Sequence, residues 1–149
     1  MWLPSMRTAA RQPKIPSPNE PNRRRYRRRL LIFNWHSLAQ QYVDALRGSD
    51  LILSFMSVAE LRMGAMSAGW GSQRRVLLER FVHGFEVFYP DDDLCTVWAR
   101  IRADARASGR AISPQDAWIA ATALALDAPL ATNNRRDFEN VRNLRLLSL

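Results

Sequence analysis

The sequence predicts one α/β domain built around a mostly parallel sheet. Short apolar runs of strand length alternate with segments of helical periodicity, which is typical of strands joined by helical crossovers. One run, residues 51–55, is almost continuously apolar, which indicates a strand covered on both faces. With 149 residues, the chain has room for one core rather than two.

The first half of the domain is predicted as strand, helix, strand and helix. Leu30–Phe33 is apolar and of strand length, and residues 37–46 place apolar side chains on one helical face. The strand at 51–55 leads directly into a helix that begins at Ser57. This order gives the parallel sheet its first helical crossover.

The second half of the domain continues the alternation with two strong helices. Three consecutive aspartates, residues 91–93, open the longer helix, where carboxylates favour the positive end of the helix dipole, and Gly109 ends it. Pro114 suits the first position of the next helix. The predicted elements of this half are helices at 73–84, 91–108 and 113–126, and strands at 85–89, 129–132 and 144–147.

The net charge of +8 belongs entirely to the N-terminal segment. Residues 1–29 hold nine basic residues and one acid, whereas residues 30–149 hold 13 of each sign. Five prolines and few apolar side chains make residues 1–29 a predicted disordered tail. Its arginines can contact RNA phosphates nonspecifically or remain solvated. The balanced domain at 30–149 offers no overall charge argument for nucleic acid.

Composition excludes several classes of protein. A single cysteine, Cys95, permits neither a disulfide framework nor a cysteine-based zinc site, and His36 and His83 lack ligand spacing. No apolar run approaches the roughly 18 residues that span a bilayer. The first ten residues also lack the apolar stretch of a secretory signal. We therefore expect a cytoplasmic protein with no membrane partner.

Polar side chains follow the predicted strands at positions where chemistry is expected. Ligands of open α/β sheets bind at the carboxyl ends of the strands. Glu60 lies shortly after the strand at 51–55, and Asp116 opens a helix. Three more polar residues stand at or after the end of the strand at 129–132, namely Thr132, Asn134 and Asp137. Carboxylates gathered there suit a hard cation, Mg²⁺ or Mn²⁺, which can promote phosphodiester cleavage.

Helix capping is an alternative interpretation of both leading acids. Ser57 and Glu60, and likewise Ser113 and Asp116, have the spacing of capping boxes, in which the acid folds back on the helix terminus. Pro114 strengthens this interpretation for the second pair. A capping acid can also be a ligand, so the spacing alone leaves both roles open.

The segment after residue 132 carries similar alternatives. Asp137 can cap a helical turn instead of serving a site. Arg135 and Arg136 can guide an RNA backbone or remain solvated surface charges. The tryptophans are expected to be core or interface residues rather than platforms for stacked bases; they include Trp70, Trp98 and Trp118.

Three segments resemble PIN-domain ribonuclease toxins of the VapC type, the toxins of VapBC toxin–antitoxin pairs. They are LILSFMSVAELRMGA at 51–65, GRAISPQDAWIAATALAL at 109–126 and LATNNRRDF at 130–138. Their order and spacing also match, so the resemblance covers about residues 32–149. Each segment is weak alone, and the combination is specific.

The resemblance implies a PIN-like three-layer α/β/α fold and a metal-dependent endoribonuclease. By the match, Glu60 and Asp116 are the second and third acids that hold Mg²⁺ or Mn²⁺, and Asp137 is a further catalytic acid. Thr132 and Asn134 occupy the turn that faces the site. The family also implies an RNA substrate, a cognate antitoxin that enters the site groove, and a homodimer.

One departure from the family concerns the first acid. The family begins with a strand that ends in an acid, but the corresponding residues 24–27 read Arg-Arg-Tyr-Arg, and no acid lies between Glu20 and Asp44. An arginine in place of a ligand would oppose a bound cation. Either residues 1–29 come from a wrong reading frame or start, or the chain is a catalytically inactive PIN-like domain that binds an antitoxin or RNA.

Overall fold

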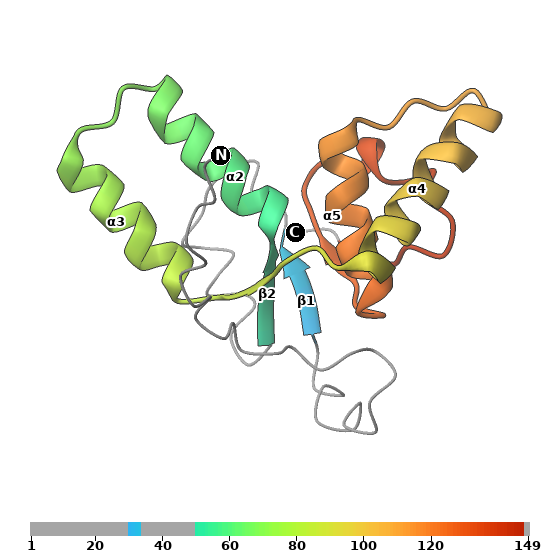
Figure 1. Cartoon of the computed structure of the whole chain (residues 1–149), viewed down its shortest axis with the longest axis horizontal. Coiled ribbons are helices and arrows are strands. Elements are labelled where there is room, and N and C mark those ends of the chain that lie inside the picture. Colours follow the sequence, from blue (N-terminus) through green and yellow to red (C-terminus); the bar gives the residue numbers. More distant parts are fainter. Residues whose placement is uncertain (1–29, 34–49, 148–149) are drawn as a thin grey trace, which may run out of the picture.

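The computed structural model describes residues 30–33 and 50–147, and the side chains of residues 51–147 (Figure 1). Three predictions lie outside these residues: the basic tail at 1–29, the helix at 37–46, and an ordinary role for His36. Within the described ranges, no helix combines the length and apolar character needed to cross a bilayer.

Five strands form one sheet within the described residues, in the order β3-β2-β1-β4-β5. All the pairings are parallel, which confirms the prediction of a parallel sheet. The central strand pairs with both neighbours, because Ile32 is in register with Ile52 on one side and with Leu130 on the other. The strands are β1 (Leu30–Phe33), β2 (Asp50–Ser54), β3 (Glu86–Phe88), β4 (Leu130–Ala131) and β5 (Leu146–Leu147).

Between β2 and β4, helices connect the strands as the sequence predicts, and each predicted boundary within the described residues lies within two residues of the observed one. Asp91 caps α4 by accepting a hydrogen bond from the Leu94 N–H at 2.8 Å. The chain leaves α4 through Gly109, whose φ of +66° favours glycine. The helical segments are α2 (Phe55–Ser67), α3 (Ser72–His83), α4 (Asp92–Ala107), α5 (Pro114–Ala125) and the 3₁₀ turn η2 (Arg135–Asp137).

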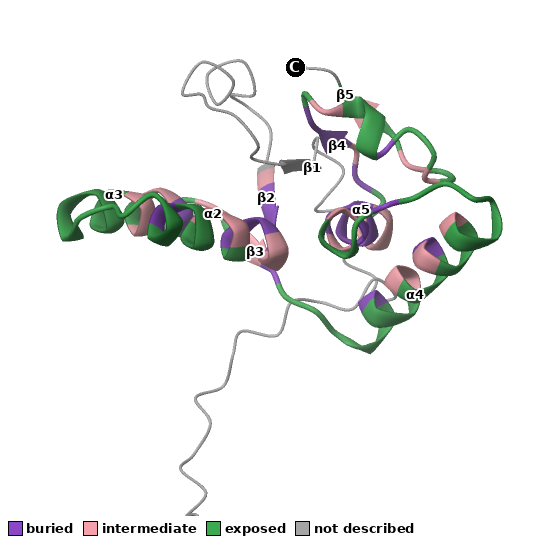
Figure 2. Ribbon diagram, turned by 90° about the horizontal axis from the view of Figure 1, so that it is seen from above, coloured by how far each residue is buried: buried purple, intermediate pink, exposed green. Residues whose placement is uncertain are grey.

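Two apolar clusters cover the two faces of the sheet. Neighbouring strand residues point in opposite directions, so Ile52 and Leu130 join the larger cluster while Leu53 and Ala131 join the smaller. The larger cluster contains residues of α4 and α5, and the smaller contains residues of α2 and α3. Figure 2 shows α4 and α5 together on one side of the strands, with α2 and α3 projecting away. The result is the three-layer α/β/α arrangement that was predicted.

Buried hydroxyl groups join α5 to the end of β2. Thr122 and Ser54 are fully buried, and their Oγ1 and Oγ atoms form a hydrogen bond of 3.1 Å. The Thr122 hydroxyl also donates to the Trp118 carbonyl at 2.9 Å, and Ser54 Oγ accepts from the Met56 N–H at 3.3 Å. This small network ties α5 to the strand–helix junction where α2 begins.

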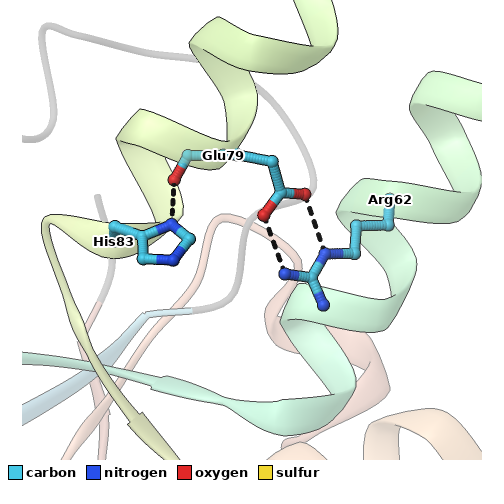
Figure 3. A network of polar contacts seen from close by, with 3 residues as sticks. All are labelled: Arg62, Glu79 and His83. Carbon is cyan, nitrogen blue, oxygen red and sulfur yellow. Dashed lines mark hydrogen bonds and ion pairs between the residues drawn. The ribbon is translucent and has the colours of Figure 1, made fainter.

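The helices α2 and α3 form a hairpin held by an ion pair (Figure 3). Arg62 donates through Nε and Nη2 to the two carboxylate oxygens of Glu79, at 2.9 and 2.8 Å. The hydrogen bond from Arg62 lowers the pKa of Glu79, and the same bond raises the pKa of Arg62. One turn further along α3, His83 Nδ1 donates to the Glu79 carbonyl at 2.6 Å, so His83 has a structural partner.

A first prediction concerns the buried hydroxyl network. Thr122→Val preserves the side-chain shape but leaves Ser54 Oγ without this partner, so the free energy of unfolding should fall by about 1–2 kcal/mol. Thr96→Val on α4 is the matched control, because the exposed Thr96 hydroxyl also donates to a carbonyl four residues earlier, at 3.2 Å. Urea denaturation measures both. Equal losses in the two variants would contradict a contribution from burial.

A second prediction concerns the pH dependence of the hairpin. Glu79 has a lowered pKa in the folded chain, so the pair stabilises the fold above the unfolded pKa of Glu79 and loses this contribution as the pH falls through the folded value. Both side chains are more than one-third exposed, at 46% and 39%, so we expect a coupling of about 0.5 kcal/mol.

A double-mutant cycle of Arg62→Gln and Glu79→Gln, measured by urea denaturation at neutral and acidic pH, tests this pH dependence. The coupling should be present near neutral pH and absent below the folded pKa of Glu79. A coupling that persists in acid would show that the pair does not depend on the ionised carboxylate.

Candidate functional site

Asp116 lies in the first turn of α5 and is held there by Ser113. The Ser113 Oγ atom accepts a hydrogen bond from the Asp116 N–H at 3.0 Å and donates to Asp116 Oδ2 at 2.6 Å. Pro114 occupies the first helical turn, as expected. The capping interpretation of Ser113 is therefore confirmed. It fixes a half-buried carboxylate at the helix start, so capping and a role in a site are compatible here.

Glu60 lies in the second turn of α2, and capping does not explain its position. The helix begins at Phe55, and its N-cap is Ser54 rather than Ser57. The capping box predicted for Ser57 and Glu60 is therefore wrong, because the strand ends one residue earlier than the apolar run suggested. The Ser57 hydroxyl is instead buried and has no hydrogen-bond partner among the described residues. Glu60 itself is half-buried.

Aromatic rings connect the helices that carry the two acids. Phe55, the first residue of α2, meets Trp118 of α5 edge to face, with ring centroids 5.4 Å apart. The other neighbour of Trp118 is Trp98 of α4, stacked at 4.9 Å with an interplanar angle of 19°. α2 begins directly after the carboxyl end of β2, and α5 is joined to that end by the Thr122–Ser54 hydrogen bond and the Trp118–Phe55 contact. Glu60 and Asp116 therefore come from adjoining helices at this edge.

The turn after β4 forms its own hydrogen-bonded unit. Thr132 is fully buried, and its Oγ1 accepts from the Asn134 N–H at 3.1 Å. The Asn134 side chain donates through Nδ2 to Asp137 Oδ2. These bonds give the predicted site-facing turn a defined local structure, with Thr132 as its buried anchor.

Asp137 lines a groove that includes neither Glu60 nor Asp116. It is the last residue of η2, so the alternative that it caps a helical turn is wrong. Its groove measures about 670 Å³ and is lined by residues of α4, the following loop and the segment 137–143, with neither Glu60 nor Asp116 among them. Arg135 and Arg136, in the same turn, are exposed.

The donor atoms available at the sheet edge suit a hard cation. Mg²⁺ is commonly held by one or two carboxylates, with water and substrate phosphates completing its shell. Glu60 and Asp116 offer that donor set, whereas Cys95 is exposed on α4 and His83 is engaged on α3. In the part of the chain that the structure describes, no three His, Cys, Asp or Glu side chains gather in a way that could hold a metal ion.

Comparisons with known proteins agree with the fold and with the order of the segments. Residues 29–144 match the PIN domain family. Ribonuclease VapC1 of Haemophilus influenzae strain R2866 is 30% identical over 108 residues, which cover 72% of this chain and 81% of the relative. This chain belongs to the VapC-type PIN domain family. The predicted family and fold class are thereby confirmed.

Two further relatives support the VapC-type assignment. The tRNA(fMet)-specific endonuclease VapC of Shigella flexneri is 31% identical over 100 residues, covering 67% of this chain and 76% of the relative. The solved structure of VapBC-1 from nontypeable Haemophilus influenzae is 25% identical, with a TM-score of 0.65 over 80% of this chain and 96% of that chain. The shared fold extends over nearly the whole of that VapC-type neighbour.

The sequence alone did not reveal how Ser54, Trp98 and Trp118 support the candidate site. Ser54 caps α2, although it stands within the apolar run and directly before Phe55, so its strand position concealed the cap. Trp98 and Trp118 were expected to be core or interface residues, and both do pack partly buried against the larger cluster. Trp98 of α4 reaches the start of α5 only because α4 packs across α5. The spacing of residues along the sequence does not reveal this packing.

A third prediction concerns the Ser113 cap. Ser113→Ala removes the acceptor of the Asp116 N–H and should lower the free energy of unfolding by about 1 kcal/mol, whereas Ser113→Gly should cost only a few tenths of that. Ser108→Ala, at the exposed C-terminus of α4, is the control and should cost little. Thermal or urea denaturation measures all three. A Ser113→Ala variant as stable as the control would contradict the capping role.

Proposed function

We propose that this chain is a metal-dependent endoribonuclease toxin of a type II toxin–antitoxin system, cleaving RNA phosphodiesters in the cytoplasm. One observation carries the proposal. Two half-buried carboxylates, Glu60 and Asp116, come from helices that begin at the carboxyl edge of the sheet and meet through the ring contact between Phe55 and Trp118. Relatives named as ribonucleases across most of their length support the same activity.

In the proposed reaction, Glu60 and Asp116 would hold Mg²⁺ or Mn²⁺. When bound, such an ion activates water and stabilises the negative charge that develops at the phosphate. Ser113 keeps Asp116 Oδ2 in place through its 2.6 Å hydrogen bond, which reduces the freedom that the carboxylate would lose on binding. Ser113 would thus both cap α5 and support a metal ligand.

The turn after β4 would contribute to substrate binding. Arg135 and Arg136 are exposed and positively charged, so they suit contacts with the phosphates of an RNA backbone. Thr132 and Asn134 form the base of this turn and hold Asp137 through the Asn134 amide. Because the groove beside Asp137 does not include Glu60 or Asp116, we propose that Asp137 acts on the RNA rather than as a metal ligand.

A cognate antitoxin and a second copy of the chain are the proposed protein partners. The VapBC-1 neighbour supports the antitoxin, because its name designates a toxin–antitoxin pair. The α2–α3 hairpin also exposes large apolar side chains, and an exposed apolar patch is typical of a protein-binding surface. These side chains include Met63, Met66 and Leu77, which are 62%, 69% and 61% exposed. A protein partner would cover this surface.

A second candidate function has one specific observation in its favour. The central strand, Leu30–Phe33, contains no acid, and none lies between Glu20 and Asp44. A PIN-like domain without its first acid would be catalytically inactive and would still bind an antitoxin or RNA. The two candidates differ in one measurable property, which is metal-dependent cleavage.

A fourth prediction tests the reaction. The purified full chain should cleave bulk tRNA or mRNA with Mn²⁺ or Mg²⁺, and EDTA should stop it. Asp116→Asn and Glu60→Gln should each lower the cleavage rate about 100-fold or more, because each removes a charged ligand. Asp93→Asn, an exposed acid in the first turn of α4, should retain full activity.

The outcomes separate the candidate functions. Cleavage that resists EDTA, or that survives Asp116→Asn, would contradict the proposed metal site. A folded wild-type chain that cleaves no RNA would favour the inactive binding domain. Arg136→Gln, which removes an exposed positive charge, should weaken RNA binding, measured as a raised KM, more than it slows cleavage at saturating RNA.

A further inference from the structure

Four side chains form a continuous series of contacts that joins three helices, and we call it the aromatic ladder. Its members are Arg102 and Trp98 of α4, Trp118 of α5, and Phe55 of α2. The guanidinium carbon of Arg102 lies 6.0 Å from the Trp98 ring centroid, Trp98 stacks on Trp118 at 4.9 Å, and Trp118 meets Phe55 at 5.4 Å. The aromatic ladder thus connects α4, which carries no proposed metal ligand, to α5 and α2, which carry Asp116 and Glu60.

Two members of the ladder also bind the backbone around the start of α5. The Trp98 indole N–H donates to the Pro114 carbonyl at 3.1 Å, and Arg102 donates through Nη1 to the Ile112 carbonyl. These two carbonyls flank Ser113, the residue that caps α5 and holds Asp116. The position of the Asp116 carboxylate is therefore linked to α4 through Trp98 as well as to its own cap.

Fixing this position matters for a carboxylate ligand. Metal-binding groups work only when supporting contacts hold them within about half an ångström of the productive geometry. A ring alone can slide along its stacking partner, whereas an N–H donor bound to a carbonyl fixes the register between the two helices. Trp98 supplies both contacts, and its neighbour Trp118 lies two residues from Asp116.

The structure assigns Trp98 the role of a positioning residue that holds the first turn of α5, and with it Asp116, against α2 and Glu60. This inference rests on the proposed function, because it concerns a carboxylate that is proposed to bind a metal ion. Trp98 acts through Pro114 and Trp118 and touches neither the metal ion nor the RNA. A tryptophan with a purely structural role would affect stability but not the metal affinity of the folded chain.

Trp98→Phe tests this role because it keeps an aromatic ring and removes the N–H donor. Trp70→Phe is the matched control: Trp70 also has an arginine, Arg74, with its guanidinium carbon 6.0 Å from the ring, but it lies at the end of the α2–α3 hairpin and is 38% exposed. The full chain is titrated with Mn²⁺ by calorimetry. Hydrogen exchange of the amides at 115–118 is followed by mass spectrometry.

We expect Trp98→Phe to weaken Mn²⁺ binding about fivefold, the effect of one hydrogen bond of ordinary net strength. The amides at 115–118 should exchange faster, and kcat for bulk tRNA should fall while KM stays within twofold of wild type. Trp70→Phe should match the wild type in Mn²⁺ affinity and in exchange at 115–118. Trp98→Tyr, which lacks the indole donor, should behave like Trp98→Phe.

The contrary results are distinct from a failure of the proposed function. If Trp98→Phe loses thermal stability but keeps the wild-type Mn²⁺ affinity, Trp98 is merely structural, and the inference is overturned. Unchanged exchange of the amides at 115–118 overturns it as well, whether or not the chain binds Mn²⁺. If Asp116→Asn binds Mn²⁺ as tightly as wild type, the proposed metal site itself is wrong.

Discussion

Parallel pairing of every strand is the constraint on which the rest of this structure depends. A parallel strand cannot be joined to its neighbour by a tight turn, so helices must return the chain from one edge of the sheet to the other. They cover both faces, and for this reason Ile52 and Leu53 point into separate apolar clusters. The same geometry gathers all carboxyl strand ends at one edge, where α2 and α5 begin.

The start of α5 combines stability and chemistry in the same few residues. Ser113 caps the helix and also holds the carboxylate of Asp116, while alanines such as Ala117 and Ala120, both fully buried, let the helix approach the sheet closely. Such small side chains give α5 few contacts that would prevent it from shifting sideways along the sheet. Trp98 of α4 instead holds α5 in place, because its ring stacks on Trp118 of α5 and its indole N–H binds the Pro114 carbonyl.

Family membership and chemistry rest on different parts of the chain. The match at residues 29–144 extends over most of the chain, so the family assignment rests on the whole domain rather than on one motif. The proposed site is less complete, since Glu60 and Asp116 are its two proposed metal ligands and the central strand Leu30–Phe33 has no acid. Residues 30–149 carry no net charge, so the proposed contacts with RNA would depend on exposed arginines such as Arg135.

The sequence by itself determined the elements and their alternation, because apolar periodicity and helix-start signals are local and survive in any context. The two leading acids, Glu60 and Asp116, are predicted by the resemblance of their segments to the family, because the spacing of each acid fits a helix cap equally well. Tertiary structure decided what those signals could not distinguish. Ser113 and Ser57 precede an acid by the same spacing, yet only Ser113 is a cap, since the end of β2 makes Ser54 the first residue able to cap α2. The ring contacts of Trp98 also required tertiary structure, because they join residues that meet only when α4 packs on α5.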